Sequence, residues 1–317
     1  MAAQFSQPET SYALEGLVST PMERIDGRGY DDYRRLKFEI GNSPSSSGSA
    51  YISGAGCEWQ VCIKLDVVEG VNAGGLEAQV DFTSAAVNSQ QIPSLITPGL
   101  LSNLVNVTIS PIIPPSVFQI LEAGDKSKSF RLQLTAALMS VRDCSSSSII
   151  DTLFLGVKMA LSETRLPRTR PLVFEAQGDT AGDSLNEDLE KFGLKTGGAG
   201  HRNRNAADYE LIDQWHEGDP VRGVENLPLS ITLNVIQEAF FLDASSLEGA
   251  VPGLIAYTLL FGKDGSIKGT QLLGNGELEY KQLPKLIHEA SRLIKDLFRL
   301  FDKEELLTID ADDKMKE

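Results

Sequence analysis

Two polar stretches of the sequence carry groups that could bind a phosphate. One is a run of four serines at a predicted strand-to-helix junction, where backbone N–H groups and the helix dipole attract anions. The same serines could simply cap the helix. The other stretch places three guanidinium groups within six residues just after that helix, either as a loop that contacts phosphates or as a solvated loop. The residues concerned are Ser145, Ser146, Ser147, Ser148, Arg165, Arg168 and Arg170.

Sequence signatures of common catalytic sites are missing from the rest of the chain. No G-x-S-x-G, Walker A or H-E-x-x-H motif occurs, and Gly54-Ala55-Gly56 lacks the third glycine of a dinucleotide fingerprint. The cysteines form no CxxC or CxxH pair, which argues against a disulfide framework and a zinc ribbon. The histidines are predicted to be surface residues. We therefore predict no catalytic, cofactor-binding or metal-binding residue. The residues set aside in this way are Cys57, Cys62, Cys144, His201, His216 and His288.

The composition is that of a folded but acidic protein. The chain has 317 residues and a net charge of −15, with 41% hydrophobic residues, which fits one large domain or two small ones. Such acidity argues against a free-standing nucleic-acid binder, so any RNA contact should be local or shared with partners. The first residues lack a basic and apolar leader pattern, and no apolar run is long enough to cross a bilayer. Secreted and membrane-spanning proteins are therefore not expected.

Short apolar segments predict a series of strands in the first half of the chain. In residues 58–68, apolar residues alternate with polar ones from Trp59 onward, which is typical of a strand with one face on a core. A helix is expected near 93–107, and a long strand at 131–141 leads into an amphipathic helix that ends before Pro167. The predicted strands of this half are 35–40, 49–53, 58–68, 76–82 and 131–141.

The second half repeats the succession of strands followed by a helix. The turn residues Lys263-Asp264-Gly265 predict a hairpin, and the last helix carries an apolar stripe from Leu283 to Leu297. Two such halves predict an α+β protein in which helices pack on one face of mostly antiparallel sheets. The predicted strands of this half are 229–236, 239–243, 253–262 and 266–273.

The uneven distribution of charge predicts the domain boundaries. Residues 175–190 carry six acids and no base, whereas 191–205 carry four bases and no acid. Because apolar residues are few here, this region is expected to be an exposed insertion, and the acidic C-terminus a solvated tail. The predicted organisation is a folded half at 1–174, the insertion at 175–225, a second folded half at 226–301 and the tail at 302–317.

Several short motifs in both halves point to a known family. In the first half they are Arg24-Ile25-Asp26-Gly27-Arg28, Asp32-Tyr33-Arg34, Phe38-Glu39-Ile40-Gly41 and Ala160-Leu161-Ser162-Glu163-Thr164-Arg165-Leu166-Pro167. In the second half they are Asp243-Ala244-Ser245, Asp264-Gly265-Ser266-Ile267 and Gly274-Asn275-Gly276. With these motifs the chain resembles the RNase PH superfamily, and specifically the ring subunits of the RNA exosome. The resemblance implies an RNase PH-like fold, two halves of mostly antiparallel sheet packed with helices.

The resemblance also bears on activity. Active members of the superfamily are phosphorolytic 3′-to-5′ exoribonucleases that hold phosphate with a Gly-Thr-Arg-Thr-like segment and use a carboxylate in the second half. Here Ser147 stands where the family's arginine would be, and the apolar residues 253–256 hold no carboxylate. Phosphorolysis needs both a cationic clamp and an acid or metal ligand. We therefore predict a degenerate phosphate site at the serine run and a non-catalytic subunit. An active phosphate-dependent exoribonuclease and an acidic protein-binding adaptor without RNA contact remain alternatives.

The resemblance further implies partners and a location. They are other RNase PH-like subunits of a six-membered ring, including a neighbour of the mRNA transport regulator type, a cap protein with RNA-binding modules, RNA in the channel and a separate nuclease. The expected location is the nucleus, nucleolus and cytoplasm. The candidates for RNA contact, which could instead pair with acids of a neighbouring subunit, are Arg165, Arg168, Arg170, Arg131 and Arg142.

We expect the polar insertion to be dispensable for folding, because it offers little apolar surface to offset the entropy of ordering. A variant lacking residues 178–205 should keep the thermal midpoint of the full chain and should still assemble. Differential scanning calorimetry and size-exclusion chromatography measure both properties. Unfolding of this variant would mean that the segment is part of the core.

Overall fold

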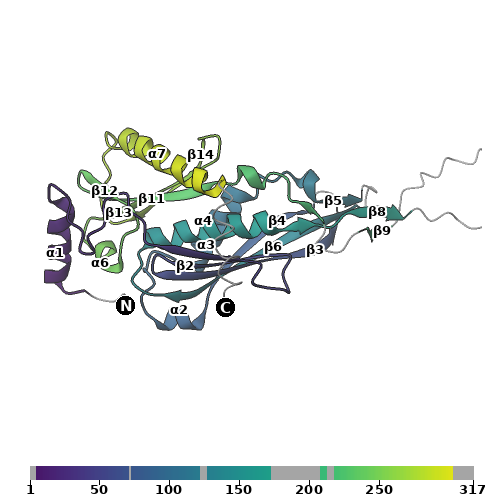
Figure 1. Ribbon diagram of the computed structural model, residues 1–317, viewed down its shortest axis with the longest axis horizontal. Coiled ribbons are helices and arrows are strands. Elements are labelled where there is room, and N and C mark those ends of the chain that lie inside the picture. Colours follow the sequence, from purple (N-terminus) through teal and green to yellow (C-terminus); the bar gives the residue numbers. More distant parts are fainter. Residues whose placement is uncertain (1–4, 71–72, 122–126, 173–207, 213–217, 303–317) are drawn as a thin grey trace, which may run out of the picture.

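A computed structural model describes residues 5–70, 73–121, 127–172, 208–212 and 218–302 (Figure 1). Its larger sheet has the strand order β1-β2-β3-β6-β4, and β5 adds to one end of β6. All pairings are antiparallel except that of β4 with β6. The predicted strands of the first half are therefore present. Their bounds are Leu36–Ile40 (β1), Gly48–Gly54 (β2), Cys57–Glu69 (β3), Gly75–Phe82 (β4) and Lys128–Val141 (β6), and the short β5 (Gln119–Leu121) was not predicted.

Helix α4 (Ser146–Glu163) is the central element of the core. Almost all of its residues from Ser147 to Leu161 are buried, because the helix packs against β2 and β3 of the larger sheet and against β11 of the second sheet. The alternation predicted in β3 is confirmed, since Trp59, Val61 and Ile63 are all fully buried. The indole of Trp59 donates a hydrogen bond of 3.1 Å to Thr152 of α4. The two halves of the chain thus share one helix.

The second sheet has the order β12-β11-β13-β14 and is antiparallel throughout. Every residue of β11 is buried, and because alternate side chains point to opposite faces, both faces of this sheet must be covered. Helices α4 and α7 lie on its two sides (Figure 1). The expectation of helices on only one face is wrong for this sheet. The bounds are Leu229–Ile236 (β11), Ala239–Phe241 (β12), Ile255–Phe261 (β13), Ile267–Gly274 (β14) and Leu283–Asp302 (α7).

Helix α3 (Pro98–Ile109) covers the edge of the larger sheet at β4. The Asn106 amide accepts a hydrogen bond of 2.8 Å from the Ala78 N–H and donates one of 2.7 Å to its carbonyl. The Ser102 hydroxyl accepts a further bond from the Val80 N–H at 2.9 Å. Side chains therefore replace a neighbouring strand along this edge, and β4 is closed to further pairing.

Several short elements were not expected from the sequence. They are α1 (Gln7–Val18), α2 (Ser84–Asn88), α6 (Ser246–Gly249), β7 (Arg165–Leu166), β8 (Thr169–Leu172), β9 (Asp208–Leu211) and β10 (Asp219–Pro220). Helix α1 begins with a capping box between Ser6 and Glu9, and its Ala13 and Leu17 are buried in a small apolar cluster with Phe241. Its short stripe of two buried residues explains why no helical periodicity was evident.

Part of the predicted insertion differs from expectation. Strand β9 pairs with β8, and β10 pairs with β7. Val221 and Val224, which follow β10, are buried. The residues next to the second half therefore belong to the folded body. Residues 173–207, with His201, and residues 213–217, with His216, lie outside the described residues, as does the tail from 303 onward. His288 is exposed on α7, as predicted. No helix in the described ranges is long and apolar enough to span a membrane.

Close packing of α4 on the larger sheet gives a test of the fold. A Cβ atom at Gly156 would lie 3.1 Å from both Ile52 and Val61. The variant Gly156→Val should therefore be destabilised by roughly 2 kcal/mol through overpacking. Urea unfolding measures this change. The matched control is Ser162→Val on the exposed face of the same helix, and an equal loss of stability in both would contradict the packing argument.

Candidate functional site

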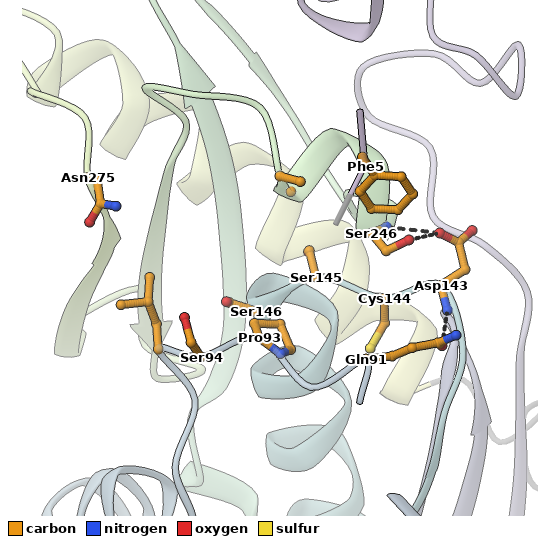
Figure 2. A pocket seen from close by; sticks show the side chains of 13 residues that line it. Phe5, Gln91, Pro93, Ser94, Asp143, Cys144, Ser145, Ser146, Ser246 and Asn275 are labelled. Atoms are coloured by element: carbon orange, nitrogen blue, oxygen red, sulfur yellow. Dashed lines mark hydrogen bonds between the residues drawn. The ribbon is translucent and has the colours of Figure 1, made fainter. Parts of the chain in front are cut away.

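The first two serines of the run, Ser145 and Ser146, line a pocket of about 480 Å³ at the junction of β6 and α4, called here the serine-lined pocket (Figure 2). Ser145 is the N-cap residue of α4, but its hydroxyl makes no capping bond and lies 2.6 Å from the Ser147 hydroxyl instead. Ser147 is fully buried, and the Ser148 hydroxyl donates to Asp243 at 2.7 Å. Ser145 and Ser147 therefore bond to each other and Ser148 bonds to the second half, so the Ser145 hydroxyl does not cap the helix.

The charge that faces this pocket is negative. Asp143 is the one charged residue among the described residues that line it. Its carboxylate accepts hydrogen bonds from the Ser246 N–H at 2.9 Å and the Ser246 hydroxyl at 2.6 Å, and its own N–H donates to Gln91 (Figure 2). Arg34 approaches Asp143 at 3.7 Å but does not line the pocket. An anion placed here would meet a carboxylate and no facing cation.

The carboxylate that active members of the family carry in the second half is predicted to be missing at 253–256, next to β13. Leu254, Ile255 and Ala256 are buried apolar residues, and the backbone continues directly into β13. The pocket receives from the second half only Ser246, Gly249, Ala250 and Asn275. The described lining thus contains no carboxylate from the second half that could serve as an acid or a metal ligand. No group of three or more metal-ligating side chains occurs within the ranges that the structure describes.

Next to this pocket lies an ion-pair network that connects the N-terminal segment to the second half. Arg28 and Arg34 both reach the fully buried carboxylate of Asp243, at 2.9 Å and 2.7 Å. Arg24 forms a bidentate pair with the buried Glu248, with both N···O distances at 2.8 Å. Sequence reasoning used these residues only as marks of resemblance. An Arg-x-x-x-Arg spacing before the first strand was the signal that charged partners elsewhere must exist.

The pKa of Asp243 shows which effect controls this network. Burial by itself raises the pKa of this carboxyl, but hydrogen bonds and charge attraction from Arg34, with a further bond from Ser148, hold it below its usual range. Asp243 is therefore charged at neutral pH. Because the guanidinium groups are committed to Asp243, none of them is directed into the serine-lined pocket.

The five arginines predicted to contact RNA are not brought together. Arg165, Arg168 and Arg170 lie at the end of the molecule that carries β8 and β9, opposite to α1 (Figure 1). Strand β6 has 14 residues and is therefore roughly 45 Å long. Arg131 lies near its start, whereas Arg142 follows its last residue. The structure thus places Arg142 far from the other four, because the start of β6 lies beside β9, where Lys128 contacts the ring of Tyr209.

Most of these arginines pair with acids of their own chain. Arg168 lies 2.7 Å from Asp219 of β10, and Arg170 pairs with Glu210 of β9. Arg131 lies 3.7 Å from Glu77 of β4. Arg165 and Arg142 are exposed and have no ion pair with an acid in the described part of the chain. These ion pairs are solvent-exposed, so each is worth little and could be exchanged for another anion.

Comparison with solved structures identifies the fold. No family model matches the chain. Its fold is similar to that of a chain in the Archaeoglobus fulgidus exosome with RNA bound to the active site, with a TM-score of 0.65, 19% identity and coverage of 93% of this chain and 98% of that one. An archaeal exosome core gives a TM-score of 0.62 at 19% identity, covering 94% and 96%. The predicted RNase PH-like α+β fold is confirmed.

Comparison with curated proteins adds a particular relative. The chain is 25% identical over 283 residues to the exosome complex component rrp42 of Schizosaccharomyces pombe, covering 86% of this chain and 83% of that protein. The segment from Tyr12 to Pro21 and the loop at 44–49 favour the same subunit. The predicted resemblance to exosome ring subunits, and among them to ribosomal RNA-processing protein forty-two, is thus confirmed.

Removing the charge of Asp243 should weaken the attachment of the N-terminal segment. Asp243→Asn leaves two guanidinium groups without their anion, which should cost about 3 kcal/mol at neutral pH. Because the folded pKa of Asp243 lies below its unfolded value, this stabilisation is present above about pH 4 and is lost as pH falls through the folded pKa. The difference between wild type and variant should therefore narrow in acid.

Urea unfolding at neutral and acidic pH measures this difference. Asp219→Asn is the matched control, because Asp219 pairs with Arg168 on the surface. It should change stability far less than Asp243→Asn does. A difference at Asp243 that stays constant down to acidic pH would show that the ion pair is not the cause.

Proposed function

We propose that this chain is a non-catalytic ring subunit of an RNA exosome, which helps to build a channel through which RNA passes for 3′-to-5′ processing and degradation. The observation that carries the proposal is the charge of the serine-lined pocket. A phosphorolytic site needs cations on the attacking phosphate, whereas this pocket presents the carboxylate of Asp143 and neutral hydroxyls. The fully buried Ser147 takes the position of the family's arginine.

The partners follow from the family. They are other RNase PH-like ring subunits, including a neighbour of the mRNA transport regulator type, together with a cap protein bearing RNA-binding modules and a separate nuclease that degrades the threaded RNA. The relative named as an exosome complex component supports the membership in such an assembly. The corresponding location is the nucleus, nucleolus and cytoplasm, where ribosomal and other RNAs are processed.

Unpaired sheet edges support assembly with neighbours. Within the described residues, β1 and β14 each have a strand on one side only, whereas the edge at β4 is covered by α3. Strand β14 also exposes Ile267 and Leu272. Unpaired backbone groups beside apolar side chains favour continuation of a sheet into a neighbouring subunit. The chain is therefore expected to be an obligate oligomer.

The pure chain should not degrade RNA. With inorganic phosphate present, release of nucleoside diphosphates from a single-stranded RNA should stay at the level of the blank, because the pocket lacks a facing cation and a second-half carboxylate. Thin-layer or liquid chromatography of the products measures this, with a phosphorolytic exoribonuclease as positive control. Phosphate-dependent release by this chain would favour the active exoribonuclease instead.

The arginines of the loop after α4 should contribute to RNA passage in the assembled ring. Replacing Arg165, Arg168 and Arg170 by alanine should weaken RNA crosslinking, and the loss should be greater at low salt because the contacts are to phosphates. The matched control replaces Arg292 and Arg299, which pair with acids on exposed α7. Ring dissociation in the triple variant would assign these arginines to a subunit interface. Unchanged crosslinking would favour an adaptor without RNA contact.

A further inference from the structure

A second pocket lies between β1, α4 and the C-terminal part of α7. Its volume is about 270 Å³, and it shares no lining residue with the serine-lined pocket. Its walls are apolar and are formed by Leu36, Phe38, Leu155 and Leu297. Pockets for drug-sized ligands measure about 300–1,000 Å³. This one is smaller and suits a single side chain or a small molecule with a short aliphatic chain.

The polar part of this pocket is the carboxylate of Asp151 on α4. Its Oδ2 accepts hydrogen bonds from the Thr232 N–H at 3.0 Å and the Tyr33 hydroxyl at 3.1 Å, and its Oδ1 accepts one from the Thr232 hydroxyl at 2.8 Å. A carboxylate oxygen can accept two hydrogen bonds, so Oδ1 retains one free acceptor position. No cation pairs with Asp151 among the described residues, because Arg34, which also lines the pocket, is bound to Asp243.

A second polar group at this pocket lies beside the same carboxylate. The Ser230 hydroxyl, on β11, is buried and forms no well-aligned hydrogen bond with any described residue. The hydroxyl acts on Asp151 without a well-aligned bond, so its oxygen can still accept a hydrogen bond from a donor in the pocket. Burial raises the pKa of Asp151 to about 6, against the opposing effect of the Thr232, Ser230 and Tyr33 hydroxyls. The carboxylate is therefore mostly charged at neutral pH.

We propose that this pocket binds a primary alkylammonium group, with its chain against Leu36, Phe38, Leu155 and Leu297 and its nitrogen at Asp151 and Ser230. An anion would be repelled by Asp151, and a neutral apolar molecule would leave the carboxylate without a counter-ion. A hard metal ion needs about six oxygen ligands, which these side chains do not supply. An ammonium group has three donors on a compact charge and fits the two acceptors.

The proposal is tested by titrating n-butylammonium chloride into the full-length chain and following heat and the Tyr33 and Leu297 NMR signals. The control probes are n-butanol, which has the chain without the charge, and tetramethylammonium, which has the charge without a donor. Butylammonium should bind about tenfold or more tightly than either control. Equal affinities for butylammonium and n-butanol would overturn the proposal.

Binding should also depend on pH. The titratable groups facing Asp151 are the neutral Tyr33 phenol and the Arg34 guanidinium, which in turn pairs with Asp243. None of the three changes its charge near neutral pH, because the pKa of Tyr33 and of Arg34 is raised and that of Asp243 is lowered. The affinity for butylammonium should therefore follow the ionisation of Asp151 and fall about tenfold from about pH 7.5 to about pH 5. An affinity that is constant over this range would overturn the proposal.

Two variants separate the carboxylate from the pocket walls. Asp151→Asn should abolish the preference for butylammonium over n-butanol, whereas Asp296→Asn, on the exposed surface of α7, should leave it unchanged. Leu297→Trp should fill the pocket and block the probe while Asp151 keeps its charge, which decides the matter even if Asp151→Asn does not fold. Retained binding in Leu297→Trp would contradict the assignment.

Titration of the assembly purified from its source identifies where the ammonium group comes from. If the probe no longer binds there, a lysine side chain of a neighbouring subunit occupies the pocket. If it binds as in the free chain, the natural ligand is a small free amine. The two results distinguish a site covered by a neighbouring subunit from one open to free amines, and neither depends on whether the chain is catalytic.

Discussion

The fully buried carboxylate of Asp243 is the constraint on which the arrangement of the two halves depends. A buried anion is tolerated only when it is paired and hydrogen-bonded, and Asp243 obtains its partners from Arg28, Arg34 and Ser148 in the first half. The loop from Asp243 to Glu248 therefore fixes the position of the N-terminal segment. It also brings Ser246 against Asp143, which sets the shape and the charge of the serine-lined pocket.

The same network explains why no cation faces the serine-lined pocket within its described lining. The start of α4 still offers a helix N-terminus, which by itself favours anions. The guanidinium groups nearest to it serve the interior of the protein, and the only charged side chain in the described lining of the pocket is Asp143. The pocket thus combines a helix N-terminus, which favours an anion, with a carboxylate that repels one.

Sequence patterns were sufficient for the elements that have a regular apolar period. Strands β3 and β11 both alternate apolar with polar residues, and both are present close to their expected bounds. Helix α1 was missed because only Ala13 and Leu17 are buried. The ion pairs could not be predicted, since the spacing of arginines in one segment does not specify which distant acid each will meet. The lack of a well-aligned hydrogen bond at Ser230 could not be predicted either, because it depends on side chains from separate elements around the pocket.

The distance along the chain between Arg24 and Glu248, 224 residues, has a consequence for biosynthesis. During translation the N-terminal segment leaves the ribosome long before its anchoring carboxylates are made. At about 5–20 residues per second, synthesis of the acidic partners follows that of the arginines by on the order of ten seconds or more. Over that interval the nascent chain can form the β1-to-β6 sheet from local and intermediate contacts, but it cannot close its N-terminal segment over the second half. Completion of the fold is therefore a late event that follows synthesis of α6.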